Sequence, residues 1–129
     1  MRVYVAGPYS RKADGTTANI IEALMNMRVG MKASVEVLLN GHVPFCPFLD
    51  YQFWLVLPDD AEIPMEAIKA YSMEWLRVSE AIVMLPGWEN SGGCKAELAE
   101  AQRLGLRVYW TMEELRADLG FKGDHWCCG

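Results

Sequence analysis

Four short hydrophobic runs recur along the chain and predict four β-strands. They are RVYVAG at residues 2–7, HVPFCP at 42–47, AIVMLP at 81–86 and RVYW at 107–110. Most positions in each run are apolar, which is typical of parallel strands that are buried on both faces. The runs end in glycine, proline or an aromatic residue, so each strand is expected to be short.

Helical periodicity fills the segments between these runs. Apolar residues spaced by three and four predict helices at Thr17–Asn40, Pro64–Ser79, Gly92–Leu104 and residues 112–120. The residues expected to face the core are Ile20, Leu24, Met27, Met31, Val35 and Leu38 in the first helix, Ile68, Tyr71, Trp75 and Val78 in the second, and Cys94, Leu98, Ala101 and Leu104 in the third. The aromatic-rich segment 48–64 is expected to be irregular, and to serve as a lid, a partner-subunit surface or a buried loop.

Strands that alternate with helices at these lengths form βαβ crossovers. The predicted fold is therefore α/β, with one domain over residues 1–129 and a flavodoxin- or Rossmann-like three-layer architecture around a mostly parallel sheet of four to five strands. Such sheets bind ligands beyond the carboxyl ends of their strands. Two polar segments follow strand ends, AGPYSRKADGTT at 6–17 and LPGWENSGG at 85–93. We expect the functional site there.

Composition narrows the class of ligand. The 129 residues carry a formal charge of −5 and no Lys/Arg-rich run, which argues against a nucleic-acid partner and favours a small molecule. The chain enters a strand pattern at once, so no signal peptide or membrane span is expected and the predicted location is cytoplasmic. The four cysteines do not have the spacing of a disulfide scaffold. His125, Cys127 and Cys128 are too closely spaced to converge on one ion, so no metal or other cofactor is expected.

The turn GWENSGGCK precedes the third helix and resembles a phosphate loop only in part. Gly93 and Cys94 separate Gly92, the second glycine of the pattern, from Lys95. The turn therefore lacks the Lys-Ser/Thr pair that follows this glycine in a nucleoside triphosphatase. A Ser-Gly-Gly turn at a helix N-terminus still offers free backbone N–H groups to an anion. Ser91 is therefore either an anion ligand or an ordinary helix cap.

Glu97 follows this turn by about one and a half helical turns. It lies roughly 9 Å along the axis from Ser91, and on the same face as Gly93. Taken alone, it is either a site carboxylate or a solvated helix glutamate. Other carboxylates within possible reach of the site are Asp50, Asp59, Asp60 and Glu74.

The first polar segment supplies further candidate ligand-binding residues. Gly7 lets a ligand approach the backbone, and Arg11 is suited to bind a phosphate through two hydrogen bonds. Tyr9 and Ser10 lie between them. The alternative for this segment is an ordinary strand-to-helix turn with polar surface residues.

Several of these motifs together resemble the nucleoside 2-deoxyribosyltransferase-like superfamily. They are VYVAGPYS at the start, Asn19 near the start of the first helix, the run YSMEWLRVSEAIVMLPGW, and SGGCKAELAEAQRLGLRVY. The resemblance covers most of the chain in order. It implies a flavodoxin-like sheet, a homodimer or larger homo-oligomer, and cleavage of the N-glycosidic bond of a nucleoside or nucleoside 5′-monophosphate.

The resemblance also assigns roles. A glutamate on the matching helix is the family's nucleophile, and Glu97 holds that position here. Six residues earlier, the monophosphate hydrolases carry a phosphate-binding serine where the transferases carry a carboxylate, and Ser91 matches the hydrolases. Ser91 and Gly93 thus become phosphate-binding candidates, and the expected activity is hydrolysis of a nucleoside 5′-monophosphate. The alternatives are base exchange by a deoxyribosyltransferase and a nucleotide-binding module without catalysis.

One position departs from the family pattern. Many members carry an aspartate in the second helix that assists the sugar or the leaving base, and Ser72 stands at the matching position. A serine hydroxyl is not a carboxylic acid at neutral pH. Ser72 is therefore a substrate-binding candidate, and the group that protonates the leaving base is left open between Asp50, another carboxylate of segment 48–64 and a residue of a partner subunit.

Overall fold

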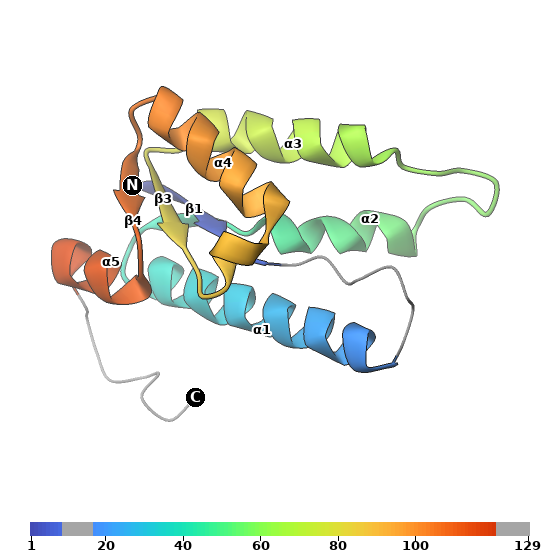
Figure 1. The fold of residues 1–129 in the computed structure, drawn as a ribbon, viewed down its shortest axis with the longest axis horizontal. Coiled ribbons are helices and arrows are strands. Elements are labelled where there is room, and N and C mark those ends of the chain that lie inside the picture. The colour runs from blue at the N-terminus through green and yellow to red at the C-terminus, as the bar shows by residue number, and fades with distance from the viewer. Residues whose placement is uncertain (9–16, 121–129) are drawn as a thin grey trace.

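The computed structural model describes residues 1–8 and 17–120, and Figure 1 shows their arrangement. In chain order the elements are β1 (Arg2–Ala6), α1 (Thr17–Leu39), β2 (Val43–Phe45), the 3₁₀ turn η1 (Pro47–Asp50), α2 (Tyr51–Leu55), α3 (Met65–Arg77), β3 (Ala81–Met84), the 3₁₀ turn η2 (Trp88–Asn90), α4 (Gly92–Arg103), β4 (Arg107–Tyr109) and α5 (Met112–Leu119). The four predicted strands and the four predicted helices are all present, with ends that differ by a few residues.

The four strands form one all-parallel sheet in the order β2-β1-β3-β4. Val3 pairs with Pro44 of β2 on one side and with Ala81 of β3 on the other. Because β2 and β3 lie on opposite sides of β1, the strand order reverses at the β1–β3 pair. This reversal is where doubly wound sheets open a crevice at their carboxyl ends.

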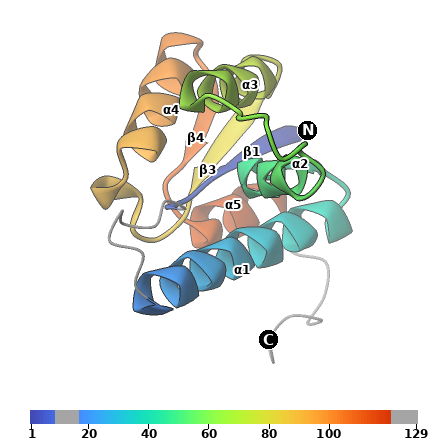
Figure 2. The same ribbon diagram turned by 90° about the vertical axis from the view of Figure 1, so that its right-hand side faces the viewer.

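Helices cover both faces of the sheet, which confirms the predicted three-layer α/β fold (Figures 1 and 2). On one face the odd-numbered residues of β1 and β3 pack with α1 and α5, in a cluster of Val3, Val5, Ala33, Val37, Ala81, Val83, Leu85, Tyr109 and Leu115. On the other face, α3 and α4 complete a cluster of Tyr4, Ala6, Leu76, Ile82, Met84, Cys94, Leu98 and Ala101. Both faces of the central strands β1 and β3 are thus buried, as the hydrophobic runs predicted.

The predicted core face of α1 is wrong. Ile20, Leu24, Met31, Val35 and Leu38 are exposed, and only Met27 of the expected stripe is buried. The buried face instead carries Gly30, Ala33, Ser34, Glu36, Val37 and Asn40. Small residues let the helix approach the sheet and Phe48 closely, since a Cβ atom at Gly30 would overlap the Phe48 ring. A pattern of large apolar residues therefore points to the wrong side of this helix.

Buried polar groups on α1 are satisfied within the helix or by α5. The Ser34 hydroxyl donates to the Gly30 carbonyl at 2.8 Å, and the Asn40 amide donates to the Glu36 carbonyl at 2.9 Å. The Glu36 carboxylate accepts from the Arg116 guanidinium on α5, with 3.0 Å between Oε2 and Nη2. These contacts explain how polar residues occupy a face that periodicity assigned to solvent.

Two further expectations need correction. Segment 48–64 is not wholly irregular, because η1 and α2 occupy residues 47–55. Trp75 on α3 and Val78 directly after it are about half exposed, while Leu76 is buried. Trp75 stacks on Phe45, with ring centroids 5.3 Å apart, so its large surface is used at the sheet edge rather than in the core.

Candidate active site

A cavity of about 430 Å³ lies between the N-terminal halves of α3 and α4, beyond the ends of β1 and β2. The described residues that line it are Gly7, Pro47, Phe48, Met65, Ile68, Lys69, Ser72, Met73, Ser91, Gly92, Gly93, Cys94, Ala96 and Glu97. Its size is within the range of small-molecule sites, and its walls are mainly apolar with a few convergent polar groups. The cavity adjoins the reversal in strand order, where a ligand site is expected.

The turn between β3 and α4 forms one wall of the cavity. Gly87 adopts a positive φ of 89°, which lets the chain turn sharply after the strand. Ser91 then caps α4, and its Oγ accepts a hydrogen bond from the Cys94 N–H at 3.2 Å. The predicted capping role of Ser91 is confirmed. Its hydroxyl proton is not used by this bond, so capping and donation to a ligand are compatible.

Gly93 keeps the space between Ser91 and Glu97 open. A Cβ atom at this position would lie 3.8 Å from Ser91 Oγ and 4.0 Å from Glu97 Oε1. These are ordinary van der Waals distances, so no clash with the protein requires a glycine here. The glycine therefore matters for the empty space above Glu97 rather than for the fold of α4.

Glu97 is partly buried in the cavity wall, because α4 turns Cys94, Leu98 and Ala101 into the core on either side of it. Burial raises the pKa of the Glu97 carboxyl to about 7. The Tyr4 hydroxyl has a smaller, opposite effect on that pKa. At neutral pH the carboxyl is thus close to half ionised, so it can take part as an anion or as an acid.

Tyr4 is a site residue that sequence reasoning missed. Its side chain is fully buried, and its hydroxyl makes no hydrogen bond of good geometry within residues 1–8 and 17–120. The hydroxyl is still close enough to Glu97 and Ser72 to interact with both, and burial followed by the Glu97 charge raises its pKa far above the usual value. A tyrosine in a strand buried on both faces needs a polar partner, and that was the available signal.

The other carboxylates near the site lie elsewhere. Glu74 accepts from Arg77 at 2.6 Å, outside the cavity lining. Asp59 and Asp60 are exposed and do not line the cavity either. The side chain of Asp50 lies outside the described part of the chain. Among the described side chains that line the cavity, Glu97 is the one carboxylate.

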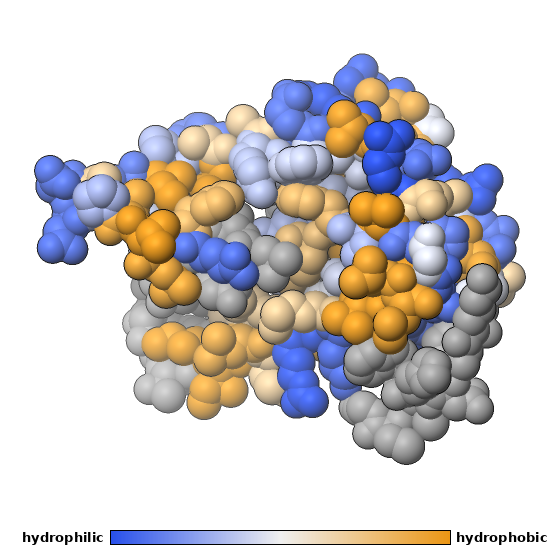
Figure 3. All heavy atoms as spheres, turned by 180° about the vertical axis from the view of Figure 1, so that it is seen from behind, coloured by the Kyte–Doolittle hydropathy of each residue, from blue (hydrophilic) through white to orange (hydrophobic). Residues whose placement is uncertain are grey.

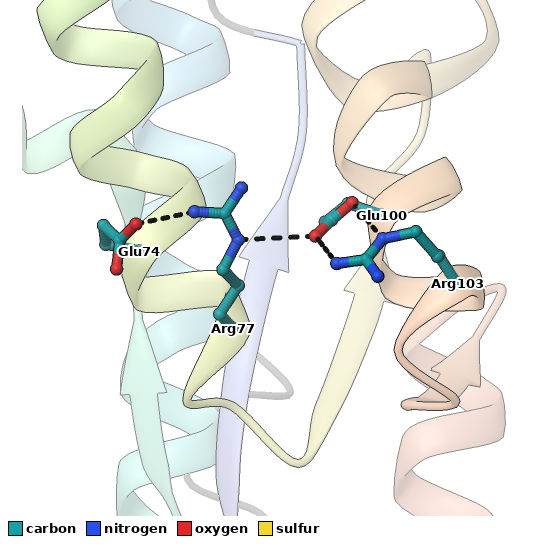
Figure 4. Close-up of polar contacts among 4 residues, drawn as sticks. All are labelled: Glu74, Arg77, Glu100 and Arg103. Atoms are coloured by element: carbon teal, nitrogen blue, oxygen red, sulfur yellow. Dashed lines mark hydrogen bonds and ion pairs between the residues drawn. The ribbon is translucent and has the colours of Figure 1, made fainter.

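Figure 4 shows the ion pairs that join α3 to α4, the two helices that line the cavity. The Arg77 guanidinium on α3 contacts Glu74 on its own helix and Glu100 on α4, with 3.4 Å between Arg77 Nε and Glu100 Oε1. Arg103 binds the same carboxylate at 2.6 Å. The hydrogen bonds from Arg103 and then from Arg77 lower the pKa of Glu100 to about 2. The pKa values of two glutamates one turn apart on α4, Glu97 and Glu100, are therefore shifted in opposite directions.

Five of the eight predicted site residues come together in this cavity: Gly7, Ser72, Ser91, Gly93 and Glu97. Tyr9, Ser10 and Arg11 lie outside the described residues. Sequence reasoning also missed Lys69, which lines the cavity one helical turn before Ser72. Cys94 is buried as predicted, and burial raises the pKa of its thiol to about 11. It is therefore a structural thiol rather than a nucleophile.

A family model matches residues 1–110, a range that contains all of these site residues. The chain belongs to the DUF4406 family. This family is described as a domain of unknown function. A comparison with curated proteins finds no match for the chain. The site of this DUF4406 protein is therefore interpreted from its own geometry.

The opposite face of the sheet holds a second cavity, of about 570 Å³, between α1 and α5. Its wall includes Trp88, Trp110 and the Glu36–Arg116 ion pair, and none of the predicted site residues lies in it. No group of three His, Cys, Asp or Glu suited to hold a metal occurs in residues 1–8 and 17–120. No helix in those residues is long and apolar enough to cross a membrane.

The raised pKa of Glu97 predicts a distinct pH dependence of stability. Between about pH 4.5 and pH 7, the folded DUF4406 chain keeps a proton that the unfolded chain has lost, so stability falls as the pH rises. Glu97→Gln removes this penalty. We expect the variant to exceed the parent at pH 8 by up to about 3 kcal/mol in the free energy of unfolding, and to match it near pH 4.5. Urea denaturation at both pH values measures the difference.

Glu100→Gln is the matched control on the same helix. In the parent, the pKa of the Glu100 carboxyl is lowered, so the stability that its ion pairs contribute is present above about pH 4.5 and is lost as the pH falls toward 2. This variant should be less stable than the parent at pH 8. An E97Q variant that gains no stability at pH 8 would show that Glu97 is well solvated.

Proposed function

We propose that this protein is an N-glycosidase that cleaves the base–sugar bond of a nucleoside 5′-monophosphate. The observation that carries the proposal is the placement of Glu97 in one cavity with the Ser91–Gly93 turn, where a carboxylate and the N-terminus of α4 line the same space. The turn suits a phosphate, and the carboxylate suits an electron-poor anomeric carbon. The resemblance of the sequence to the nucleoside 2-deoxyribosyltransferase-like superfamily supports the same assignment.

The proposed chemistry uses Glu97 as the nucleophile. A Glu97 carboxylate oxygen attacks C1′, the C1′–N bond breaks, and its electron pair leaves with the base, which takes up a proton. Water then opens the glycosyl ester and restores the carboxylate. Gly93 leaves room for the sugar above Glu97, and the apolar residues Phe48, Met65 and Ile68 offer a surface for the base.

The proposal predicts release of free base from at least one nucleoside 5′-monophosphate. A panel of ribo- and deoxynucleoside monophosphates is incubated with the protein, and free base is measured by chromatography. Glu97→Gln should still bind substrate but lose turnover by on the order of 10³-fold or more. Glu100→Gln, one turn further along α4 and outside the cavity lining, should remain active.

Other results of this assay would favour the alternatives. If an added acceptor base yields a new nucleoside, the activity is base exchange. Binding of a nucleotide without any product over long incubation would identify a binding module instead. If no base is released and no nucleotide binds, the proposed function is wrong.

The pH profile separates two uses of Glu97. A nucleophile must be ionised, so kcat/KM should rise about tenfold per pH unit up to about pH 7 and then level off. A Glu97 that donated a proton to the base would give activity that falls through the same range. Initial rates from pH 5 to pH 9 decide between them. The substrate phosphate also ionises near pH 6, so its pKa is measured separately by phosphorus NMR of the substrate.

We also propose that the protein is a cytoplasmic homo-oligomer that pairs through α1. The helix exposes nine large apolar side chains between Ile20 and Leu39, and α2 adds more (Figure 3). Exposed apolar surface of this extent is typical of a protein interface. A second copy of the chain would cover it.

Substitution on α1 tests this assembly. Leu38 is 59% exposed, so Leu38→Glu should cost the monomer little stability but place a charge in the interface. Sedimentation equilibrium should show an oligomer for the parent and a monomer for L38E, while Glu22→Gln on the same helix stays assembled. A parent that is monomeric at tens of micromolar would contradict the proposal.

A further inference from the structure

Two of the described side chains that line the cavity between α3 and α4 carry a charge. Glu97 is the anion and Lys69 is the cation. Lys69 is exposed on α3, and no ion pair or hydrogen bond of its side chain occurs within residues 1–8 and 17–120. Its ammonium group is therefore available to a ligand. The long lysine stem lets this charge move across the cavity mouth.

The joint between the two helices shows where Lys69 lies relative to the α4 turn. Arg77 and Glu100 link α3 to α4 near their C-terminal ends (Figure 4). The cavity is lined by the N-terminal parts of the same two helices. Lys69 lies eight residues before Arg77, and Gly92 lies eight residues before Glu100. At 1.5 Å per residue, each is about 12 Å from the joint. The two residues therefore line the cavity from different helices, each about two helical turns from the joint.

Ser72 and Glu97 lie nearer to the joint. They are five and three residues from Arg77 and Glu100, respectively, and both interact with the Tyr4 hydroxyl. The cavity thus has two levels. The inner level, nearer to the joint, holds Ser72 and Glu97, and the outer level holds Lys69 on α3 and the first turn of α4.

We propose that Lys69 is a specificity-determining residue that binds the 5′-phosphate of the substrate from the wall opposite the Ser91–Gly93 turn. This inference rests on the proposed function and extends it, because it assigns the preference for a nucleoside monophosphate over a nucleoside to one side chain. Glu97 and a phosphate in the same cavity repel each other, and a cation at the outer level offsets that repulsion. An ammonium group also donates charge-assisted hydrogen bonds to phosphate oxygens.

Matched substrate pairs test this assignment. The parent, Lys69→Met and Lys69→Arg are assayed with each common nucleoside and its 5′-monophosphate, and kcat/KM is measured for both. We expect K69M to lower kcat/KM for the monophosphate by on the order of 10- to 100-fold. The value of kcat/KM for the nucleoside should stay the same. K69R should keep most of the preference. Lys95→Met is the control, because Lys95 lies on the first turn of α4 outside the cavity lining.

The outcomes separate this inference from the proposed function. If the parent releases base and K69M keeps the same ratio of monophosphate to nucleoside activity, Lys69 does not bind the phosphate. Equal losses on both substrates would also overturn the assignment, since Lys69 would then act on the sugar or the base.

Thermal stabilisation supplies a readout that does not depend on catalysis. If no variant releases base, the proposed function fails, and melting temperatures are compared with adenosine and adenosine 5′-monophosphate as probes. Greater stabilisation by the monophosphate in the parent, lost in K69M and kept in K95M, would support the phosphate contact. Equal stabilisation of the parent and K69M, or none in the parent, would overturn it.

Discussion

The desolvation of one carboxylate governs the organisation of this site. Glu97 lies on a helix whose neighbouring residues Cys94 and Leu98 pack into the core, and this packing holds its side chain in the cavity wall. Burial raises its pKa, and no described arginine or lysine pairs with it to restore the ionised form. Glu100, one turn later, has two arginine partners and the opposite shift. The difference between these glutamates comes from their surroundings rather than from their sequence context on one helix.

The two glutamates also mark two parts of α4. The C-terminal part, with Glu100, contacts α3, and the N-terminal part, with Glu97, lines the cavity. The Arg77–Glu100–Arg103 contacts hold α3 and α4 together at the end of the helices that lies away from the cavity. These ion pairs contribute modestly to stability. They also fix the point along α3 and α4 beyond which the two helices separate. The space between the walls then opens toward the N-terminus of α4, where backbone N–H groups and Ser91 are found. The ion-paired Glu100 and the partly buried Glu97 thus lie in different surroundings on the same helix.

The sequence was sufficient to predict the sheet, because parallel strands buried on both faces leave an unmistakable run of apolar residues. It also predicted that Gly7, Ser91, Gly93 and Glu97 would converge, since the carboxyl ends of adjacent parallel strands must meet at one edge. The orientation of α1 could not be found in this way. Periodicity ranks residues by size and polarity, whereas close packing on the sheet selected Gly30 and Ala33 and left larger residues to the surface.

Tyr4 and Lys69 were missed for different reasons. Tyr4 sits in a strand, and the reach of its hydroxyl depends on the angle at which α3 and α4 cross above it. The sequence around Lys69 is typical of an exposed helix lysine. It lines the cavity only because α4 packs beside α3. In both cases the missing information was the relative placement of two elements that are far apart in sequence. Local patterns do not carry that information, because it follows from packing across the sheet.

Ser72 is best understood through its neighbours. The Tyr4 hydroxyl lies within reach of both Ser72 and Glu97, and it stays protonated because burial and the nearby carboxylate oppose its ionisation. The Glu97 carboxylate raises the pKa of the Tyr4 hydroxyl, as an acceptor does, whereas Ser72 lowers it, as a donor does, so the two side chains do not compete for the phenolic proton. An aspartate at position 72 would add a second negative charge beside Glu97 and raise the pKa of one of the two carboxyls further. A neutral serine avoids this repulsion and leaves Glu97 as the single titrating carboxyl among the described residues that line the cavity. Serine at position 72 therefore leaves one carboxyl rather than two among the described residues that line the cavity.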